Sequence, residues 1–398
     1  MTVSTFDVPP PDPRVYTILQ AAGFSDDLFN PRQHRACMLM ERYAVAVAAD
    51  VAARLGVSDA LESPVDTEGL MARLGFVPTF RAALEWLLDL LVAHGMLARD
   101  AGRYRRRTTG RSEPRDGLRA AILATDETYA PALALLDEAA ALYPRVARGE
   151  TNGERALFLR ASLWVAYFNN TNAYYALNNR VAARAVAGRF AGGRVLEVGA
   201  GLGSATQALL ELLAARGTLP RLDGYHASEP VVFFRRRAER TVVGAYPTVR
   251  FTFSGLDLNQ PWATQDIEPA HAEIIWGVNV FHLARDLAAT LAEARAALAP
   301  GGWLVVGEGM RPGPKERVGA ELPFQLLESF TSVELEPTVR PLPGFLTAEG
   351  WQRAFERAGF ADVGFVPDAP RLREFYPGFL AAAVCGRRPG DRTPRPTR

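Results

Sequence analysis

The chain of 398 residues is longer than one ordinary α/β domain and predicts two domains, each able to bury a core. Its formal net charge of +1 gives no general basic field, which argues against nucleic acid and membrane partners and leaves room only for a local patch. The two cysteines stand far apart without His or Cys neighbours at ligand spacing, so neither a disulfide framework nor a metal site is predicted. The lack of a leader and of a long apolar run predicts a soluble cytoplasmic protein.

Helices are predicted over residues 43–55, 67–74 and 79–92, and a two-stranded hairpin is predicted over residues 95–105. The third helix carries apolar residues at helical spacing, namely Leu84, Leu87, Leu88 and Leu91. Helices followed by a small hairpin are typical of a winged helix. Residues 1–155 are therefore predicted to form a mostly helical, winged-helix-like domain.

A winged helix also raises the hypothesis of a DNA-binding regulator. In the helix that would enter the DNA groove, Glu85 and Asp89 stand among mostly apolar residues, so donors to phosphates and base edges are scarce. The basic run at residues 103–107 favours DNA, but a solvated hairpin explains it equally well. The regulator is kept as the alternative from another functional class.

The stretch from residue 163 to 179 contains five asparagines and five aromatic residues. Asparagine is a mediocre helix former, so helix propensity does not explain this composition. One interpretation is an interdomain helix whose amides bond to neighbouring backbone. The other is a lid helix over a cofactor and substrate pocket, with Trp164, Phe168 and Tyr175 as walls and Asn172 as a polar fixing point.

Residues 194–206 predict a buried strand that runs through a glycine-rich turn into a helix. Gly199, Gly201 and Gly203 allow positive φ angles and let a ligand approach the backbone closely. The helix that follows offers unpaired N–H groups to an anion. A purely structural glycine turn is the alternative interpretation.

Polar residues follow the next predicted strands. Glu229 stands about 30 residues downstream, where an acid can bridge a ribose diol, and Asp257 follows the next strand. Asn279 and His282 follow a third apolar strand, and Glu308 ends a fourth. Because ligands in parallel sheets bind beyond the carboxyl ends of the strands, these residues are predicted to gather at one edge. Considered one at a time, Glu229 and Asp257 are equally well explained as solvated loop residues.

The alternation of strands and helices with short connections predicts a doubly wound, Rossmann-like parallel α/β sheet over residues 156–388. One helix is predicted to carry Leu283, Leu287, Leu291 and Leu298 and to stop at residues 299–302. A helical cap with Phe324 and Phe330 is predicted before the final strand at residues 379–385. Residues 389–398 are predicted to be a disordered tail.

The sequence Leu-Glu-Val-Gly-Ala-Gly-Leu-Gly at residues 196–203 resembles the first motif of class I S-adenosylmethionine-dependent methyltransferases, and it differs from the G-x-G-x-x-G of dinucleotide enzymes. The resemblance implies S-adenosylmethionine as the cofactor, held by the glycine loop, with Glu197 near its ammonium group. It also implies that Glu229 binds the ribose and that Asp257 receives the adenine amino group. Tyr175 and Asn279 are assigned to the same cofactor site.

Residues 48–61 and 87–97 resemble the N-terminal dimerisation domain of bacterial and plant small-molecule O-methyltransferases. In that family the domain serves a symmetric dimer. The resemblance therefore implies a homodimer with a two-fold interface through this domain.

From residue 195 to 308 the chain also resembles the C-methyltransferase domains of polyketide synthases. The matching elements are the glycine motif, the Phe233-Phe234 pair, and residues 256–258, 279–282 and 300–308. In that family a His and a strand-end Glu form a base dyad, which carries over to His282 and Glu308. The O-methyltransferase family places its general base at His282 too, so the two resemblances agree on the residue and differ on the acceptor atom.

Together these features predict a methyltransferase that acts on carbon of a small molecule, either a secondary metabolite or a carrier-bound intermediate. A small-molecule O-methyltransferase that uses the same histidine is the alternative. The residues predicted to bind the substrate are Trp164, Phe168, Asn172, Phe324 and Phe330.

Overall fold

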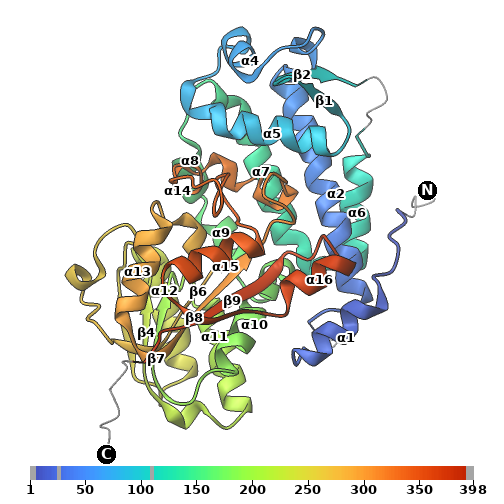
Figure 1. Cartoon of the computed structure of the whole chain (residues 1–398). Helices are drawn as coiled ribbons and strands as arrows, with labels where there is room; N and C mark the ends of the chain where they lie inside the picture. The colour runs from blue at the N-terminus through green and yellow to red at the C-terminus, as the bar shows by residue number, and fades with distance from the viewer. Residues whose placement is uncertain (1–5, 25–27, 108–111, 391–398) are drawn as a thin grey trace, which may run out of the picture.

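The computed structural model describes residues 6–24, 28–107 and 112–390, and most of the predicted tail lies outside these ranges. Figure 1 shows a helical part at one end of the molecule and a sheet flanked by helices at the other. The long helix α2 (Pro31–Arg54) runs between the two parts. Within the described ranges, no helix is both long and apolar enough to cross a membrane.

The helical part confirms the predicted helices and hairpin with changed boundaries. Helix α2 begins 12 residues before the predicted start because Asn30 caps it, accepting a bond from the Gln33 N–H, and Pro31 fits the first turn. The other elements are α3 (Val57–Ala60), α4 (Thr67–Leu74), α5 (Arg81–Ala93), the hairpin β1 (Leu97–Asp100) and β2 (Arg103–Arg106), α6 (Arg115–Thr125), and α7 (Ala130–Ala147).

The other part is a seven-stranded sheet with the strand order β5-β4-β3-β6-β7-β9-β8. Its strands are β3 (Gly193–Val198), β4 (Leu222–Ser228), β5 (Phe251–Ser254), β6 (Ala272–Val278), β7 (Leu298–Gly309), β8 (Ala361–Val366) and β9 (Ala381–Arg387). The predicted doubly wound sheet is confirmed and is parallel except at β9, which returns between β7 and β8 and pairs antiparallel with both.

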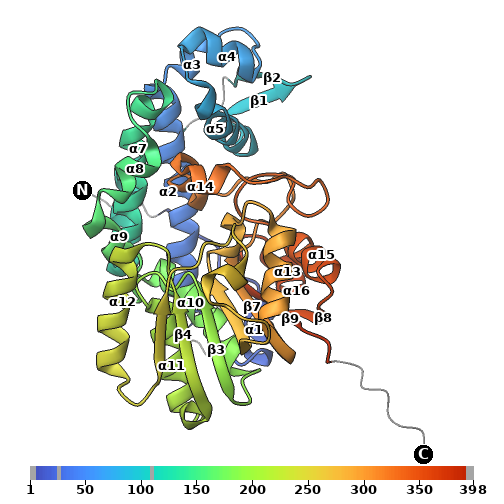
Figure 2. The same cartoon turned by 90° about the vertical axis from the view of Figure 1, so that its left-hand side faces the viewer.

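Helices cover both faces of the sheet, as the doubly wound prediction requires. One face packs against α1 (Pro13–Ala21), α10 (Ala173–Ala187), α11 (Ser204–Ala215) and α16 (Ala369–Phe375). The opposite face packs against α13 (Leu287–Ala297) and α15 (Ala348–Arg357). Figure 2 shows α12 (Val232–Ala245) along one side, next to β4 and α11.

The predicted leucine helix is wrong at both ends. Asp286 caps α13 by accepting a bond from the Ala289 N–H, so the helix begins at Leu287. Leu283 lies in the 3₁₀ turn before the cap, and Leu298 is the first residue of β7. The Ala-Pro-Gly-Gly segment that was expected to stop the helix is therefore part of the strand.

The predicted lid helix is two helices. Helix α9 (Ala161–Tyr167) ends before a turn at residues 168–172, and α10 follows it. The side chain of Asn169 accepts bonds from both the backbone N–H and the hydroxyl of Thr171, which gives the chain a turn in place of a continuous helix.

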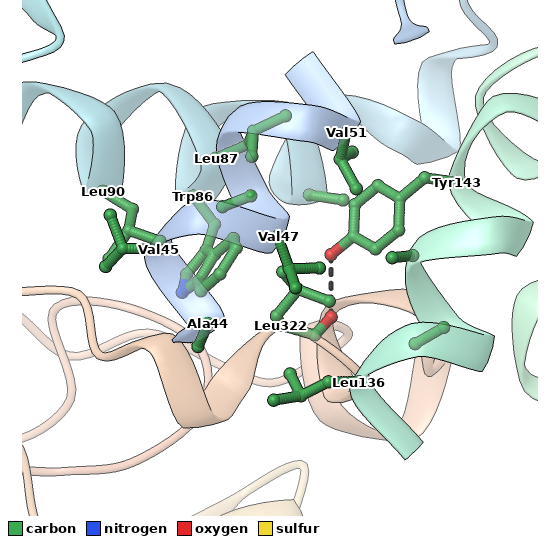
Figure 3. Packing of buried hydrophobic residues seen from close by; sticks show 14 of the residues in the cluster. Ala44, Val45, Val47, Val51, Trp86, Leu87, Leu90, Leu136, Tyr143 and Leu322 are labelled. Carbon is green, nitrogen blue, oxygen red and sulfur yellow. Dashed lines mark hydrogen bonds between the residues drawn. The ribbon is translucent and has the colours of Figure 1, made fainter. Parts of the chain in front are cut away.

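Two segments cross the predicted domain boundary at residue 155. Helix α1 precedes the helical part but packs on the sheet. Residues 318–327 follow the sheet strand β7 but pack among α2, α5 and α7. Figure 3 shows Leu322 between Val47 and Leu136, with its carbonyl accepting a hydrogen bond of 2.7 Å from the Tyr143 hydroxyl. The division into residues 1–155 and 156–388 stays a prediction.

Candidate active site

The two residues of the predicted dyad meet at the carboxyl ends of neighbouring parallel strands. His282 lies in the turn after β6, and Glu308 lies near the end of β7. The His282 Nδ1 atom is 2.6 Å from Glu308 Oε2, and only 4% of His282 and none of Glu308 is exposed. An ionised carboxylate only accepts hydrogen bonds, so this contact favours the tautomer with its proton on Nδ1, in which Nε2 of the neutral ring is the acceptor.

His282 lines a cavity of about 470 Å³ between the helical part and the sheet, and Glu308 lies behind it. The edges of Phe330 and Phe345 meet the His282 ring at centroid distances of 5.4 and 5.1 Å. The cavity lining is mostly aromatic and aliphatic, with Trp164, Tyr167, Phe168, Tyr175, Phe324 and Phe379 among its residues. Such a lining favours an apolar ligand.

Four of the five residues predicted to bind substrate line this cavity, namely Trp164, Phe168, Phe324 and Phe330. Asn172 does not. Asn172 is fully buried, and its amide donates a 2.9 Å bond to the Tyr167 carbonyl. This contact fits the first interpretation of the asparagine-rich stretch, in which the amides bond to neighbouring backbone.

Two residues assigned to the cofactor also line the cavity. Tyr175 contacts Phe168 with ring centroids 5.3 Å apart. Asn279 has a positive φ of 54°, and its Oδ1 accepts a 2.9 Å bond from the side chain of Asn178. Both therefore line the same cavity as His282, and their contact with the cofactor remains a prediction.

Sequence reasoning missed the cavity residues contributed by α2. Cys37, Met38 and Glu41 line the cavity from this helix. Glu41 Oε1 accepts a 2.8 Å bond from the Gly319 N–H, and burial raises the pKa of its carboxyl to about 7. No local pattern marks these positions, because their role depends on how α2 packs against residues 318–327.

A buried ion pair fixes one wall beside His282. Arg311 donates a 2.6 Å bond to Glu321, and the same carboxylate accepts bonds from the Trp86 indole and the Phe345 N–H. Arg311 and Glu321 are both nearly fully buried. The pair links α5 of the helical part to Phe345, whose ring touches the His282 ring.

The contacts of α5 argue against the regulator. Its residues Leu84, Leu87 and Leu88 are buried, and its Trp86 indole is bonded to Glu321 from the sheet-bearing part. A recognition helix must present a free face to the DNA groove.

The glycine loop has the shape that a cofactor needs. Gly199 and Gly201 have φ angles of 69° and 54°. A side chain at Gly199 would collide with Val280 at 2.6 Å, whereas the space above Gly201 is open within 4 Å. The N–H of Gly201 donates a 3.0 Å bond to Glu229. The loop therefore runs into α11 at Ser204 with Glu229 bonded to its backbone and free space beside Gly201.

Glu229 is 7% exposed, and its two carboxylate oxygens accept bonds from the N–H groups of Gly201 and Val231. Burial raises the pKa of this carboxyl. The two backbone bonds hold the acid against the glycine loop, where it can accept further hydroxyl bonds.

Glu197 and Asp257 occupy opposite environments. Glu197 is 1% exposed and accepts bonds from the hydroxyls of Thr206 and Tyr225. Burial raises its pKa to about 7. Asp257 is exposed and accepts a 2.9 Å bond from the N–H of Asn259 in its own loop. Their predicted contacts with the cofactor remain predictions.

Comparisons with known proteins agree with this geometry. A family model described as a methyltransferase domain matches residues 196–304. Tenellin synthetase from Beauveria bassiana is 31% identical over 174 residues, which cover 44% of this chain and 4% of the synthetase. The highly reducing polyketide synthase valA from Aspergillus terreus is 31% identical over 175 residues, or 43% of this chain and 7% of the synthase. The chain thus matches only a small part of these relatives.

Two solved structures share the fold over nearly the whole chain. The CurJ carbon methyltransferase has a TM-score of 0.76 at 22% identity, covering 95% of this chain and 97% of its own. The carbon methyltransferase domain of the citrinin polyketide synthase has a TM-score of 0.73 at 16% identity, covering 96% of this chain and all of its own.

Proposed function

We propose that the chain is a class I S-adenosylmethionine-dependent methyltransferase that transfers a methyl group to a carbon atom of an apolar small molecule, free or carrier-bound. The observation that supports this most is the 2.6 Å contact between His282 and Glu308 at the wall of the apolar cavity. Methylation at carbon needs a base that removes a proton from a weak carbon acid. A buried imidazole beside a carboxylate supplies such a base.

The residues around the glycine loop would hold the cofactor. When bound, S-adenosylmethionine supplies a methyl group on a positively charged sulfur. The open space above Gly201 would accept its amino-acid part, and Glu229 would accept bonds from the ribose hydroxyls. Tyr175 and Asn279 line the cavity that a methyl group would enter.

The chain's own contribution to the reaction is a proton transfer and a fixed position. His282 Nε2 would take the proton of the acceptor carbon, leaving an enolate whose carbon attacks the methyl group. Glu308 would balance the charge of the imidazolium through the Nδ1 bond. Aromatic walls would hold the acceptor in line, because displacement at a methyl group needs the nucleophile behind it.

Similarity over the catalytic part to polyketide synthases and to carbon methyltransferases supports carbon as the acceptor. The test is to incubate the protein with S-adenosylmethionine carrying a ¹³C methyl group and an acetoacetyl thioester, and to read the product by NMR. A methyl signal on carbon is expected. A methoxy signal would overturn the carbon assignment and favour the O-methyltransferase alternative.

A further inference from the structure

Helix α12 presents an unusual outward face. Phe233, Arg236, Arg237 and Arg240 are all exposed and stand at the i, i+3, i+4 and i+7 positions of one helical face. The inward face holds the buried residues Phe234, Ala238 and Val242. A solvated helix face explains the arginines but not the aromatic ring among them.

Exposed large apolar side chains are concentrated on α12 and at the end of α8. The described residues include seven large hydrophobic side chains that are exposed, and Leu335 is the one that lies elsewhere. The other six are Phe158, Leu159, Val231, Val232, Phe233 and Val243. We call these six residues, together with Arg236, Arg237 and Arg240, the α12 patch. Contiguous exposed apolar surface on a folded domain marks an interaction site.

The α12 patch is continuous with the substrate cavity. Phe158, at the end of α8 (Gly153–Phe158), is 37% exposed and also lines the cavity. Its ring stacks on Trp164 with a centroid distance of 5.2 Å and lies 6.4 Å from Phe234. The Phe234 ring in turn lies 5.5 Å from that of Phe233. Figure 2 shows α8, α9 and α12 following one another along one side of the molecule.

The charge of the α12 patch is strongly basic. Residues 231–240 contain four arginines and one acid, Glu239, although the whole chain has a net charge of only +1. Within the described ranges, Arg236, Arg237 and Arg240 are not among the residues that form ion pairs. Their positive charge is therefore available to a partner.

We propose that the α12 patch docks an acidic protein domain, the carrier that presents the substrate thioester at the cavity mouth. This inference rests on the proposed function, because only a carrier-bound substrate requires such a partner. Exposed arginines provide charge complementarity and faster association, and the apolar residues provide the buried centre of the contact. A partner seated on the patch would lie beside Phe158, which is both partly exposed and part of the cavity lining.

The test compares one acyl group on two supports. Acetoacetyl groups are loaded on an acyl carrier protein and on N-acetylcysteamine, and kcat/KM is measured for each. The double substitution Arg236→Glu and Arg237→Glu is expected to lower kcat/KM for the carrier-bound form by about 10-fold or more, since charge reversal at an interface slows association. The small thioester is expected to react as it does with the unchanged protein.

A matched control reverses two charges elsewhere. Arg103→Glu with Arg105→Glu changes two exposed arginines on the hairpin, away from the patch. This variant should leave both values of kcat/KM unchanged. Equal losses for the two thioesters, or no loss for the carrier-bound one, would overturn the docking proposal. Binding to phosphatidylserine vesicles that the α12 variant abolishes, without any effect on the carrier-bound reaction, would assign the patch to a membrane surface and overturn it too.

Failure of the proposed function is distinguishable. If the unchanged protein methylates neither thioester, the catalytic proposal fails, and docking is then measured by titrating the acyl carrier protein into the chain. Binding that weakens with the α12 substitutions and with rising salt would still support the docking surface. Binding that the substitutions do not change would overturn it.

Discussion

Glu308 accepts hydrogen bonds on both of its oxygens. Oε2 receives the bond from the His282 ring at 2.6 Å, and Oε1 receives bonds from the Val280 and His282 backbone N–H groups at 3.1 and 3.3 Å. The carboxylate therefore orients the ring and also fixes the turn that carries it. One buried group therefore makes both sets of contacts.

His282→Ala is expected to lower turnover by about 10²–10⁴-fold, the usual range for loss of a general base. Cofactor affinity should stay nearly unchanged, because the ring faces the cavity rather than the glycine loop. Turnover is measured with an acetoacetyl thioester at saturating S-adenosylmethionine, and affinity is measured by calorimetry.

His271→Ala is the matched control for this variant. It removes a histidine that bonds to the His226 ring, outside the cavity lining, and should leave turnover unchanged. Near-normal turnover in His282→Ala would reject the base role while leaving the methyltransferase domain in place.

Glu308→Gln is expected to be as damaging as loss of the ring. If only the bond to the ring is considered, glutamine should be a mild replacement, because its amide oxygen can still accept a hydrogen bond. The geometry reverses this, since the Val280 and His282 backbone N–H groups take the amide oxygen, and the NH₂ group then faces Nδ1 of His282. Nδ1 must accept that bond, so the ring proton moves to Nε2 and the ring can no longer act as a base there. Turnover is measured as for His282→Ala, and turnover close to that of the unchanged protein would contradict this account.

The sequence predicted which polar residues stand at the carboxyl edge of the sheet, because that edge is encoded locally. A glycine turn after a buried strand and polar residues after successive strands are short patterns, and parallel strands bring their ends together. His282 and Glu308 follow neighbouring strands and meet as predicted. Helix caps are local signals as well. The apolar spacing alone placed the start of α13 too early, because it took no account of the capping residue Asp286.

The cavity could not be predicted to the same depth. Glu41 reaches it from α2, more than 200 residues away from His282 along the chain, and Phe345 is held in place by the buried pair of Arg311 and Glu321. Such positions depend on tertiary packing, which no spacing rule records. The apolar helices that motivated a dimer are buried within the chain itself, so the dimer remains a prediction without that support.

Gly201→Val is expected to abolish cofactor binding. A β-branched residue at a φ of 54° is strained, and its side chain would fill the open space above the loop. Gly217→Val is the control, because Gly217 also has a positive φ and open space but lies at the far end of α11. The control should lose stability without losing affinity. Equal affinity for S-adenosylmethionine in both variants, by calorimetry, would remove the loop from the cofactor site.

Glu229→Ala is expected to weaken S-adenosylmethionine binding by roughly 1–3 kcal/mol, the cost of leaving hydrogen-bonding partners unsatisfied. Glu239→Ala, an exposed acid on α12, is the control and should bind as the unchanged protein does. Calorimetric affinities that agree between the two variants would show that Glu229 only braces the backbone of Gly201 and Val231.

Glu197 should make the fold less stable as the pH rises. Burial raises the pKa of its carboxyl from 4.5 to about 7, so the folded state favours the neutral form. Its contribution to stability is fully present below pH 4.5 and is lost as the pH rises through 7, by roughly 3 kcal/mol at most.

Glu197→Gln keeps an oxygen that can accept the Thr206 and Tyr225 hydroxyl bonds. Its unfolding free energy, measured in urea from pH 5 to 8, should fall less than that of the unchanged chain. The fall should not vanish, because Glu41 titrates with the same sign. Parallel curves for the two proteins would show that Glu197 is ionised in the folded state throughout this range.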